Sequence, residues 1–154
     1  MHYLFYTLLS WGIIYLFVGR RFFLLWKAAS IGLLIAVTVD YFGIKHNLYY
    51  YTEGIVYIGN QPLLGLISVF GSVILYMNWL PRQWNERVLY TAYVSVLFLA
   101  VEAAMYQAGA IQYPHWQLWY SYFLLNGGLL LVACLADLLG INPNNENQRQ
   151  LPGE

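Results

Sequence analysis

Five apolar stretches, separated by short polar connections, dominate the pattern of the chain. They cover residues 3–18, 22–44, 62–80, 88–108 and 114–139. A bilayer core about 30 Å thick needs roughly 20 apolar helical residues, because each backbone polar group in lipid has to find its partner within the segment. The pattern therefore predicts an all-α integral membrane bundle of five transmembrane helices, with the first span the shortest and the last the longest.

Prolines mark several of the predicted helix ends. Pro62 suits a first helical turn, where its missing N–H has no intrahelical partner to lose. Pro81 is expected to stop the third helix, and Pro114 to open the fifth. From residue 142 the chain is polar, so residues 1–141 are predicted to form the transmembrane domain and residues 142–154 a solvated cytoplasmic tail.

Basic residues fall mainly on one side of the predicted bundle. That side carries Arg20, Arg21, Lys27, Arg82, Arg87 and Arg149, and the opposite side carries Lys45. Because Lys and Arg concentrate in cytoplasmic loops, this distribution predicts an outside N-terminus and a cytoplasmic C-terminus. The first apolar run is preceded by no basic region and followed by no small-residue cleavage site, which indicates an uncleaved first helix. Asp137 is expected at the inner interface or paired with one of the arginines.

The composition excludes several classes of protein. Hydrophobic residues make up 60% of the chain and charged residues 9%, against about 25% charged residues in a soluble domain. A net charge of zero excludes the basic surface that binds nucleic acid. The one cysteine, Cys134, excludes a disulfide framework, and His2, His46 and His115 show no metal-ligand spacing. We therefore expect neither a nucleic-acid partner nor a metal, and the sequence identifies no cofactor.

Small residues indicate where the helices meet, because association in lipid depends on close backbone approach and not on a hydrophobic driving force. Ala28, Gly32 and Ala36 form a strip with a spacing of four on the second helix. In the fifth helix Gly127 and Gly128 follow Asn126, and this glycine pair lowers the helix propensity. Close packing, a kink and a bound ligand are all open explanations for the pair.

Two acids fall inside apolar spans and need a physical reason. A central Asp costs about 2.5–3.5 kcal/mol on translocon-based scales, so an intramembrane acid is a candidate functional group. Asp40 continues the small-residue strip by one further step of four, and Glu102 shares a helix face with Ser95 and Tyr106. Both are predicted to point into the bundle from its outer half. The alternative is that neighbouring donors satisfy each acid and that the acids fix helix register.

Aromatic residues gather at the same outer level as the two acids. Tyr50 lies in the loop after the second helix, and residues 115–120 begin the fifth span with an imidazole, two indoles and a phenol. We expect a pocket that opens to the outside, in which Asp40, Glu102 and His115 converge. The predicted ligand-binding residues are Asp40, Glu102, His115, Trp116, Trp119, Tyr120, Tyr50 and Asn126. The alternative for the rings is an aromatic belt at the level of the lipid headgroups.

One part of the chain resembles a known family. An acid in a late helix precedes a glycine-containing loop, then a Tyr, a Trp and a Tyr-Ser pair, and upstream lie a membrane Asp, a tyrosine run and a proline. The residues are Glu102, Gly109, Tyr113, Trp116 or Trp119, Tyr120, Ser121, Asp40, residues 49–51 and Pro62. Over residues 40–126 this arrangement is similar to a family of small uncharacterised multispanning membrane proteins found chiefly in endospore-forming Firmicutes. The resemblance implies a bacterial cytoplasmic-membrane protein and supplies no established activity.

These features favour a binding or transport-related protein that is not an enzyme, with an outward-facing pocket for a small apolar or cationic ligand. Two alternatives stay open. One is a membrane enzyme acting on a lipid or isoprenoid, with Glu102 as general acid and His115 or Asp40 as its partner. The other is a structural subunit of a membrane complex, whose small-residue strips contact a second copy or another membrane protein. The lipid bilayer surrounds the protein in each case.

Overall fold

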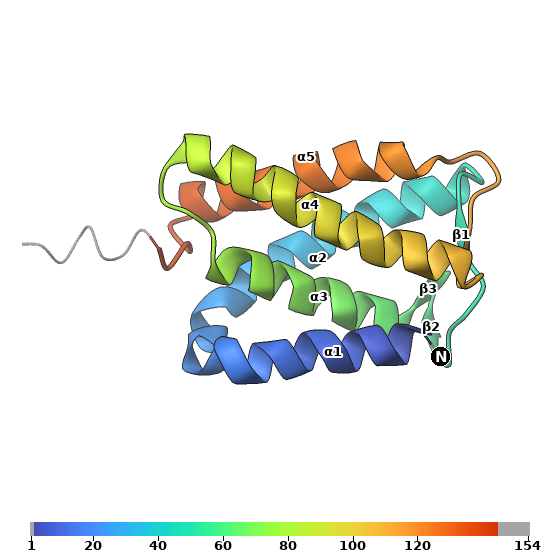
Figure 1. Ribbon diagram of the computed structural model, residues 1–154, viewed down its shortest axis with the longest axis horizontal. Coiled ribbons are helices and arrows are strands. Elements are labelled where there is room, and N and C mark those ends of the chain that lie inside the picture. The colour runs from blue at the N-terminus through green and yellow to red at the C-terminus, as the bar shows by residue number, and fades with distance from the viewer. Residues whose placement is uncertain (1, 145–154) are drawn as a thin grey trace, which may run out of the picture.

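Five antiparallel α-helices make up most of the structure, a computed structural model that describes residues 2–144. The helices are α1 (His2–Phe17), α2 (Phe22–Lys45), α3 (Leu63–Asn78), α4 (Trp84–Gln107) and α5 (Leu118–Leu138), with a short 3₁₀ turn, η1 (Gly19–Arg21), between the first two. Each α-helix overlaps one of the five predicted apolar segments. The predicted helical architecture is therefore confirmed, and the connections gather at two opposite ends of the bundle (Figure 1).

Three helical segments are long and apolar enough to cross a membrane, which indicates a membrane protein. They are residues Gly19–Lys45, α4 and α5. The other two helices, α1 and α3, are apolar but have 16 residues each. At 1.5 Å per residue they are about 24 Å long, which is less than a typical hydrocarbon core of about 30 Å.

The end of the bundle that carries residues 46–62 and 108–117 is called here the tyrosine end. Four very short strands order its two connections. β1 (Tyr50–Tyr51) pairs with β4 (Ile111–Gln112), and β2 (Tyr57–Ile58) pairs with β3 (Gln61–Pro62), both in antiparallel register. The β1–β4 pair joins the connection after α2 to the connection before α5. The sequence pattern predicts helices only, because strands of two residues give no periodic signal.

The core is most densely packed away from the tyrosine end. There α3 packs between α1 and α2, and α5 packs against both α2 and α4. Leu25 and Ala28 of α2, Met77 of α3 and Ala133 of α5 are fully buried in one cluster. Gly32, in the predicted small-residue strip, lets α2 approach α3 so closely that a Cβ at this position would lie 2.7 Å from Val73 Cγ2.

The opposite end, residues 18–21, 79–83 and 139–144, is called here the arginine end. Arg87 is 1% exposed at this end. Its guanidinium pairs with Asp137, which is one of the two predicted alternatives, and its Nε donates to the Pro81 carbonyl oxygen at 2.7 Å. Asn142 Nδ2 donates to the second Asp137 oxygen at 2.6 Å. These bonds join α4, α5 and two connections, so Arg87 is buried with its charge compensated.

The predicted solvated tail differs from the structure in its first residues. Asn142 is buried, and Asn144 Nδ2 donates to the carbonyl oxygens of Met77 at 3.2 Å and Leu80 at 3.3 Å. Arg21 donates in turn to Asn144 Oδ1 at 2.9 Å. The expectation of a solvated chain is wrong at Asn142 and Asn144, because their side chains form hydrogen bonds with Asp137 and with carbonyl groups at and just after the end of α3. Residues 145–154 of the predicted tail lie outside the described residues.

We expect Gly32→Ala to destabilise the bundle, because the new methyl group forces Val73 and the α2–α3 contact apart. Overpacking of this kind costs about 1–3 kcal/mol. Gly12→Ala in α1 is the matched control, since a Cβ there meets nothing within 4 Å. The midpoint of thermal unfolding in one detergent should fall for Gly32→Ala and stay unchanged or rise for Gly12→Ala. Equal midpoints for the two variants would contradict the close α2–α3 packing.

Candidate functional site

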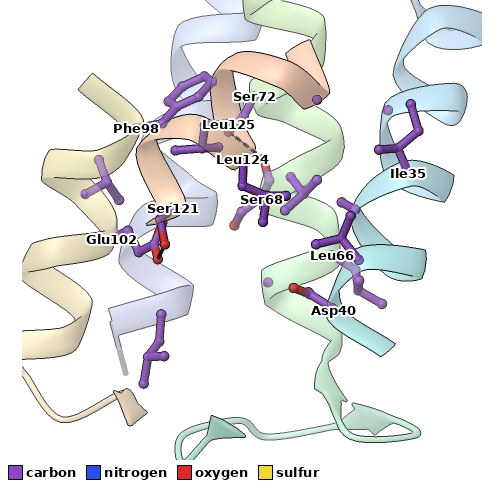
Figure 2. Close-up of a pocket in the computed structure, with 18 of the residues that line it drawn as sticks. Ile35, Asp40, Leu66, Ser68, Ser72, Phe98, Glu102, Ser121, Leu124 and Leu125 are labelled. Carbon is purple, nitrogen blue, oxygen red and sulfur yellow. Dashed lines mark hydrogen bonds between the residues drawn. The ribbon is translucent and has the colours of Figure 1, made fainter. Parts of the chain in front are cut away.

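A cavity of about 480 Å³ extends from the tyrosine end to the middle of the bundle. Side chains of α2, α3, α4 and α5 form its walls, with contributions from α1 and from both connections at the tyrosine end (Figure 2). Most of the lining is apolar. The volume lies in the range of about 300–1,000 Å³ that small-molecule sites occupy.

Asp40 of α2 lies at one side of the cavity and accepts a hydrogen bond on each carboxyl oxygen. Tyr49 Oη donates to Oδ1 at 2.8 Å, and Tyr51 Oη donates to Oδ2 at 2.9 Å. After α2 ends, Asn47 adopts φ 55°, a left-handed conformation that asparagine tolerates, and this reverses the chain toward the helix. Gly43 leaves the space for Tyr49, because a Cβ there would lie 2.5 Å from the tyrosine ring.

Glu102 of α4 lies across the cavity from Asp40 (Figure 2). The hydroxyl groups of Tyr113 and Ser121 both donate to Oε1, the serine at 2.5 Å. Trp116 Nε1 donates to Ser121 Oγ at 2.8 Å, which orients the serine hydroxyl toward the acid. Within residues 2–144, no hydrogen bond ends on Glu102 Oε2.

The ring of Tyr49 joins the two acidic groups into one cluster. It makes edge-on contacts with Tyr51, Tyr113 and Trp116, with ring centroids 6.1, 6.4 and 5.5 Å apart. Such pairs have favourable geometry for aromatic quadrupoles. One aromatic cluster therefore carries the donors of Asp40 and, through Tyr113 and Trp116, those of Glu102.

The cavity is acidic and has no basic counterpart. Among the described residues that line it are the acids Asp40 and Glu102, and none of them is Lys, Arg or His. Burial raises the pKa of Tyr49, and the nearby carboxylates of Asp40 and Glu102 raise it further. Burial and the Glu102 carboxylate raise the pKa of Tyr113 in the same way. Both phenols therefore stay protonated well above neutral pH and act as donors.

Tyr3 of α1 adds an unsatisfied polar group to the lining. The residue is 5% exposed, and its hydroxyl has no hydrogen-bond partner in the described part of the chain. Buried hydroxyl groups are normally paired, and an exception calls for an unseen water or ligand. The donor and acceptor capacity of the Tyr3 hydroxyl is therefore unused by the described residues.

The exposed part of the cavity lining lies along α5. Every lining residue that is exposed belongs to this helix, and these residues are Phe123, Leu124, Gly127 and Leu131. The lining residues at the tyrosine end are buried or half-buried. The expected opening at the outer end stays a prediction, and the paired β1 and β4 and the tyrosine cluster lie at that end.

The structure brings together three of the eight predicted ligand-binding residues. Asp40, Glu102 and Trp116 line the cavity. The five that do not line it are His115, Trp119, Tyr120, Tyr50 and Asn126.

The main cause of this difference is the start of the fifth helix. It begins at Leu118 and not at Pro114, so His115 lies in an irregular connection and is exposed. The backbone N–H of His115 donates to the Leu48 carbonyl oxygen at 3.2 Å. The predicted convergence of Asp40, Glu102 and His115 is therefore wrong for His115. Asn126 instead bonds within its own helix, to the Tyr122 carbonyl oxygen at 2.9 Å.

The predicted ligand-binding residues do not include the hydroxyl donors Tyr49, Tyr51, Tyr113 and Ser121. For Tyr49 and Tyr51 the sequence did contain a signal, which is their spacing. Side chains two positions apart share one face of an extended strand, so Tyr49 and Tyr51 point the same way, toward Asp40. Tyr50 points the opposite way and is exposed.

Comparison of the chain with family models, with curated proteins and with solved structures gives no significant match. The resemblance to membrane proteins of endospore-forming Firmicutes therefore stays a prediction, and the site is interpreted from its own geometry.

We expect the Tyr113 phenol to remain protonated at pH 11 in the folded protein, because its pKa is raised from the usual value of about 10. Tyr113→Phe should therefore leave the tyrosinate absorbance of the folded protein at pH 11 unchanged and lower it only after denaturation. Above about pH 10 the unfolded chain releases this proton and the folded chain retains it, so stability falls as pH rises. A folded Tyr113→Phe protein that lacks the absorbance of one tyrosinate at pH 11 would contradict the buried hydrogen bond.

Proposed function

We propose that this protein spans the membrane five times and binds, or carries across the membrane, a small ligand that is cationic at one end and otherwise apolar. One observation supports this proposal above the others. Two carboxyl groups border a single, largely apolar cavity whose described lining contains no basic side chain. A cation in the cavity complements both acids and the aromatic rings beside them.

The hydrogen bonds at the acids supply donors but no countercharge. Two hydroxyl groups donate to each carboxyl group. These hydroxyl groups are neutral, so they do not supply a positive charge. A buried charge without a partner is costly, so a ligand cation between Asp40 and Glu102 gains more from this site than it would from water.

A purely structural role for the acids accounts for less of the geometry. If Asp40 and Glu102 only fixed helix register, packed side chains would fill the space between them, as they do near Ala28 and Met77. Instead a cavity of about 480 Å³ adjoins both acids, and Tyr3, one of the residues that line it, has a buried hydroxyl group without a hydrogen-bond partner in the described part of the chain. Both features favour a bound ligand.

The arrangement in the membrane follows from the charges at the two ends. Arg20, Arg21 and Arg82 lie at the arginine end, and Lys45 lies at the end of α2 next to the tyrosine end. The positive-inside rule then favours a cytoplasmic arginine end and C-terminus, with the N-terminus and the tyrosine end outside. Local thinning of the bilayer accommodates the short α1 and α3 as the remaining two spans. The resemblance described above favours the bacterial cytoplasmic membrane.

The other functions left open by the sequence gain no specific support. In the enzymatic alternative, His115 no longer qualifies as a partner for Glu102, because it is exposed and does not line the cavity. Asp40 is still available for that role. A structural subunit of a membrane complex stays a prediction as well.

Asp40→Asn and Glu102→Gln should each weaken binding of dodecylamine, a cationic amphiphile at neutral pH, by about tenfold or more, which corresponds to about 1.4 kcal/mol. Each variant removes one negative charge and keeps the size of the side chain. Equilibrium binding of radiolabelled dodecylamine to protein in lipid nanodiscs, corrected with empty nanodiscs, measures the effect. Dodecanol, which has the same chain and no charge, should bind more weakly than dodecylamine to the wild-type protein.

Glu86→Gln is the matched control, because it removes the same charge from an exposed position in the first turn of α4. It should bind dodecylamine as the wild-type protein does. Unchanged affinity in both acid variants, with folding retained, would refute the proposed role of the cavity.

A further inference from the structure

We infer that the ligand is a single-chain amphiphile whose head carries an ammonium N–H group, and that it enters the cavity sideways from the lipid through the opening along α5. The inference rests on the proposed function and adds to it the class of ligand and the route of access. It assigns the head group to the two acids and the alkyl chain to the apolar wall along α5.

The position of the exposed lining residues indicates where a ligand enters the cavity. Phe123, Leu124 and Leu131 line it and are 64%, 40% and 47% exposed. They belong to α5, which is long and apolar enough to cross a membrane, so their exposed faces contact acyl chains. Figure 2 shows Leu124 on the side of α5 that faces the cavity. An apolar molecule dissolved in the bilayer therefore reaches this opening without passing through water.

The glycine pair Gly127 and Gly128 lies at this opening. A Cβ added at Gly127 or Gly128 would meet nothing within 4 Å. Gly32 is the contrast, because a Cβ there would lie 2.7 Å from Val73. Close helix packing thus explains Gly32 but not the glycine pair. The pair instead leaves free space in the wall of the cavity, near the middle of α5.

The polar and apolar parts of the cavity lie at different depths. Asp40 lies five residues before the end of α2 at Lys45, and Glu102 lies five residues before the end of α4 at Gln107. Both acids are therefore about 7–8 Å below the helix ends at 1.5 Å per residue. From there the lining continues along α5 through Gly127 and Gly128, at the middle of the helix, as far as Val132. A head near the acids and a chain toward the midplane match the orientation of a lipid in that leaflet.

The hydrogen bonds at Glu102 indicate which kind of head group fits the cavity. Glu102 lines the cavity, and its Oε2 accepts no hydrogen bond from the described residues. This oxygen is an acceptor for an N–H donor. An ammonium group that carries hydrogens supplies this donor together with the positive charge, whereas a quaternary ammonium group supplies the charge alone.

The experiment compares two amines and two kinds of variant in lipid nanodiscs. Dodecylamine and butylamine share a head group and differ in chain length. Gly128→Leu fills the opening along α5, and Gly127→Leu does so from the more exposed neighbouring position. Gly12→Leu on the exposed side of α1 is the control, because it adds the same side chain at a glycine that has free space around it and does not line the cavity.

In the wild-type protein we expect dodecylamine to bind at least a hundredfold more tightly than butylamine, after correction for partition into empty nanodiscs. Gly128→Leu and Gly127→Leu should weaken dodecylamine binding at least tenfold and leave butylamine binding within twofold. Gly12→Leu should change neither affinity. Thermal unfolding of each variant verifies that it is folded.

Three results would overturn the inference. Dodecylamine affinity could be the same in both opening variants and the wild-type protein, the longer chain could bring no gain in affinity, or a bound two-chain phospholipid could resist displacement by dodecylamine. Each of these leaves the proposed function intact if Asp40→Asn still weakens butylamine binding. If Asp40→Asn and Glu102→Gln change neither amine's affinity, the proposed function fails, whatever the opening variants show.

Discussion

The pairing of two carboxyl groups, each on a helix long and apolar enough to cross a membrane, with hydroxyl donors is the interaction on which the tyrosine end of this structure depends. In a low-dielectric surrounding an acid requires donors, and here Asp40 draws two tyrosines from one connection. Glu102 draws Tyr113 from the other connection and Ser121 from α5. The acids therefore organise segments that carry no regular secondary structure beyond strands of two residues.

The two halves of the bundle satisfy their charges in different ways. At the arginine end, Arg87 and Asp137 neutralise each other, and packed side chains leave the neighbouring core solid. At the tyrosine end, neutral hydroxyl groups solvate the acids, and a cavity lies between them. Stability alone gives no reason to bury two acids without a countercharge at one end of the bundle. We therefore associate the tyrosine end, where Asp40 and Glu102 have no basic partner, with function.

The sequence predicts the helices well because long apolar segments have few alternatives in lipid. It also identifies Asp40 and Glu102, since a charged residue in such a segment is conspicuous. It does not predict how the connections fold or which of their side chains reach the acids. Pro114 fits a first helical turn on local grounds, but the backbone bond from His115 to Leu48 and the β1–β4 pair keep that stretch extended until Leu118. Contacts between segments distant in the chain decide which rings reach the acids, and periodicity carries no information about them.

The central claim is that Asp40 and Glu102 share one ligand-accepting cavity. An experimental structure of the protein in lipid nanodiscs saturated with dodecylamine tests it most directly. The account predicts density for the amine inside the cavity, with its nitrogen within about 4 Å of a carboxyl oxygen, the usual reach of an ion pair. Side chains packed solidly between the two acids, or an amine bound only on the outer surface of the helices, would contradict it.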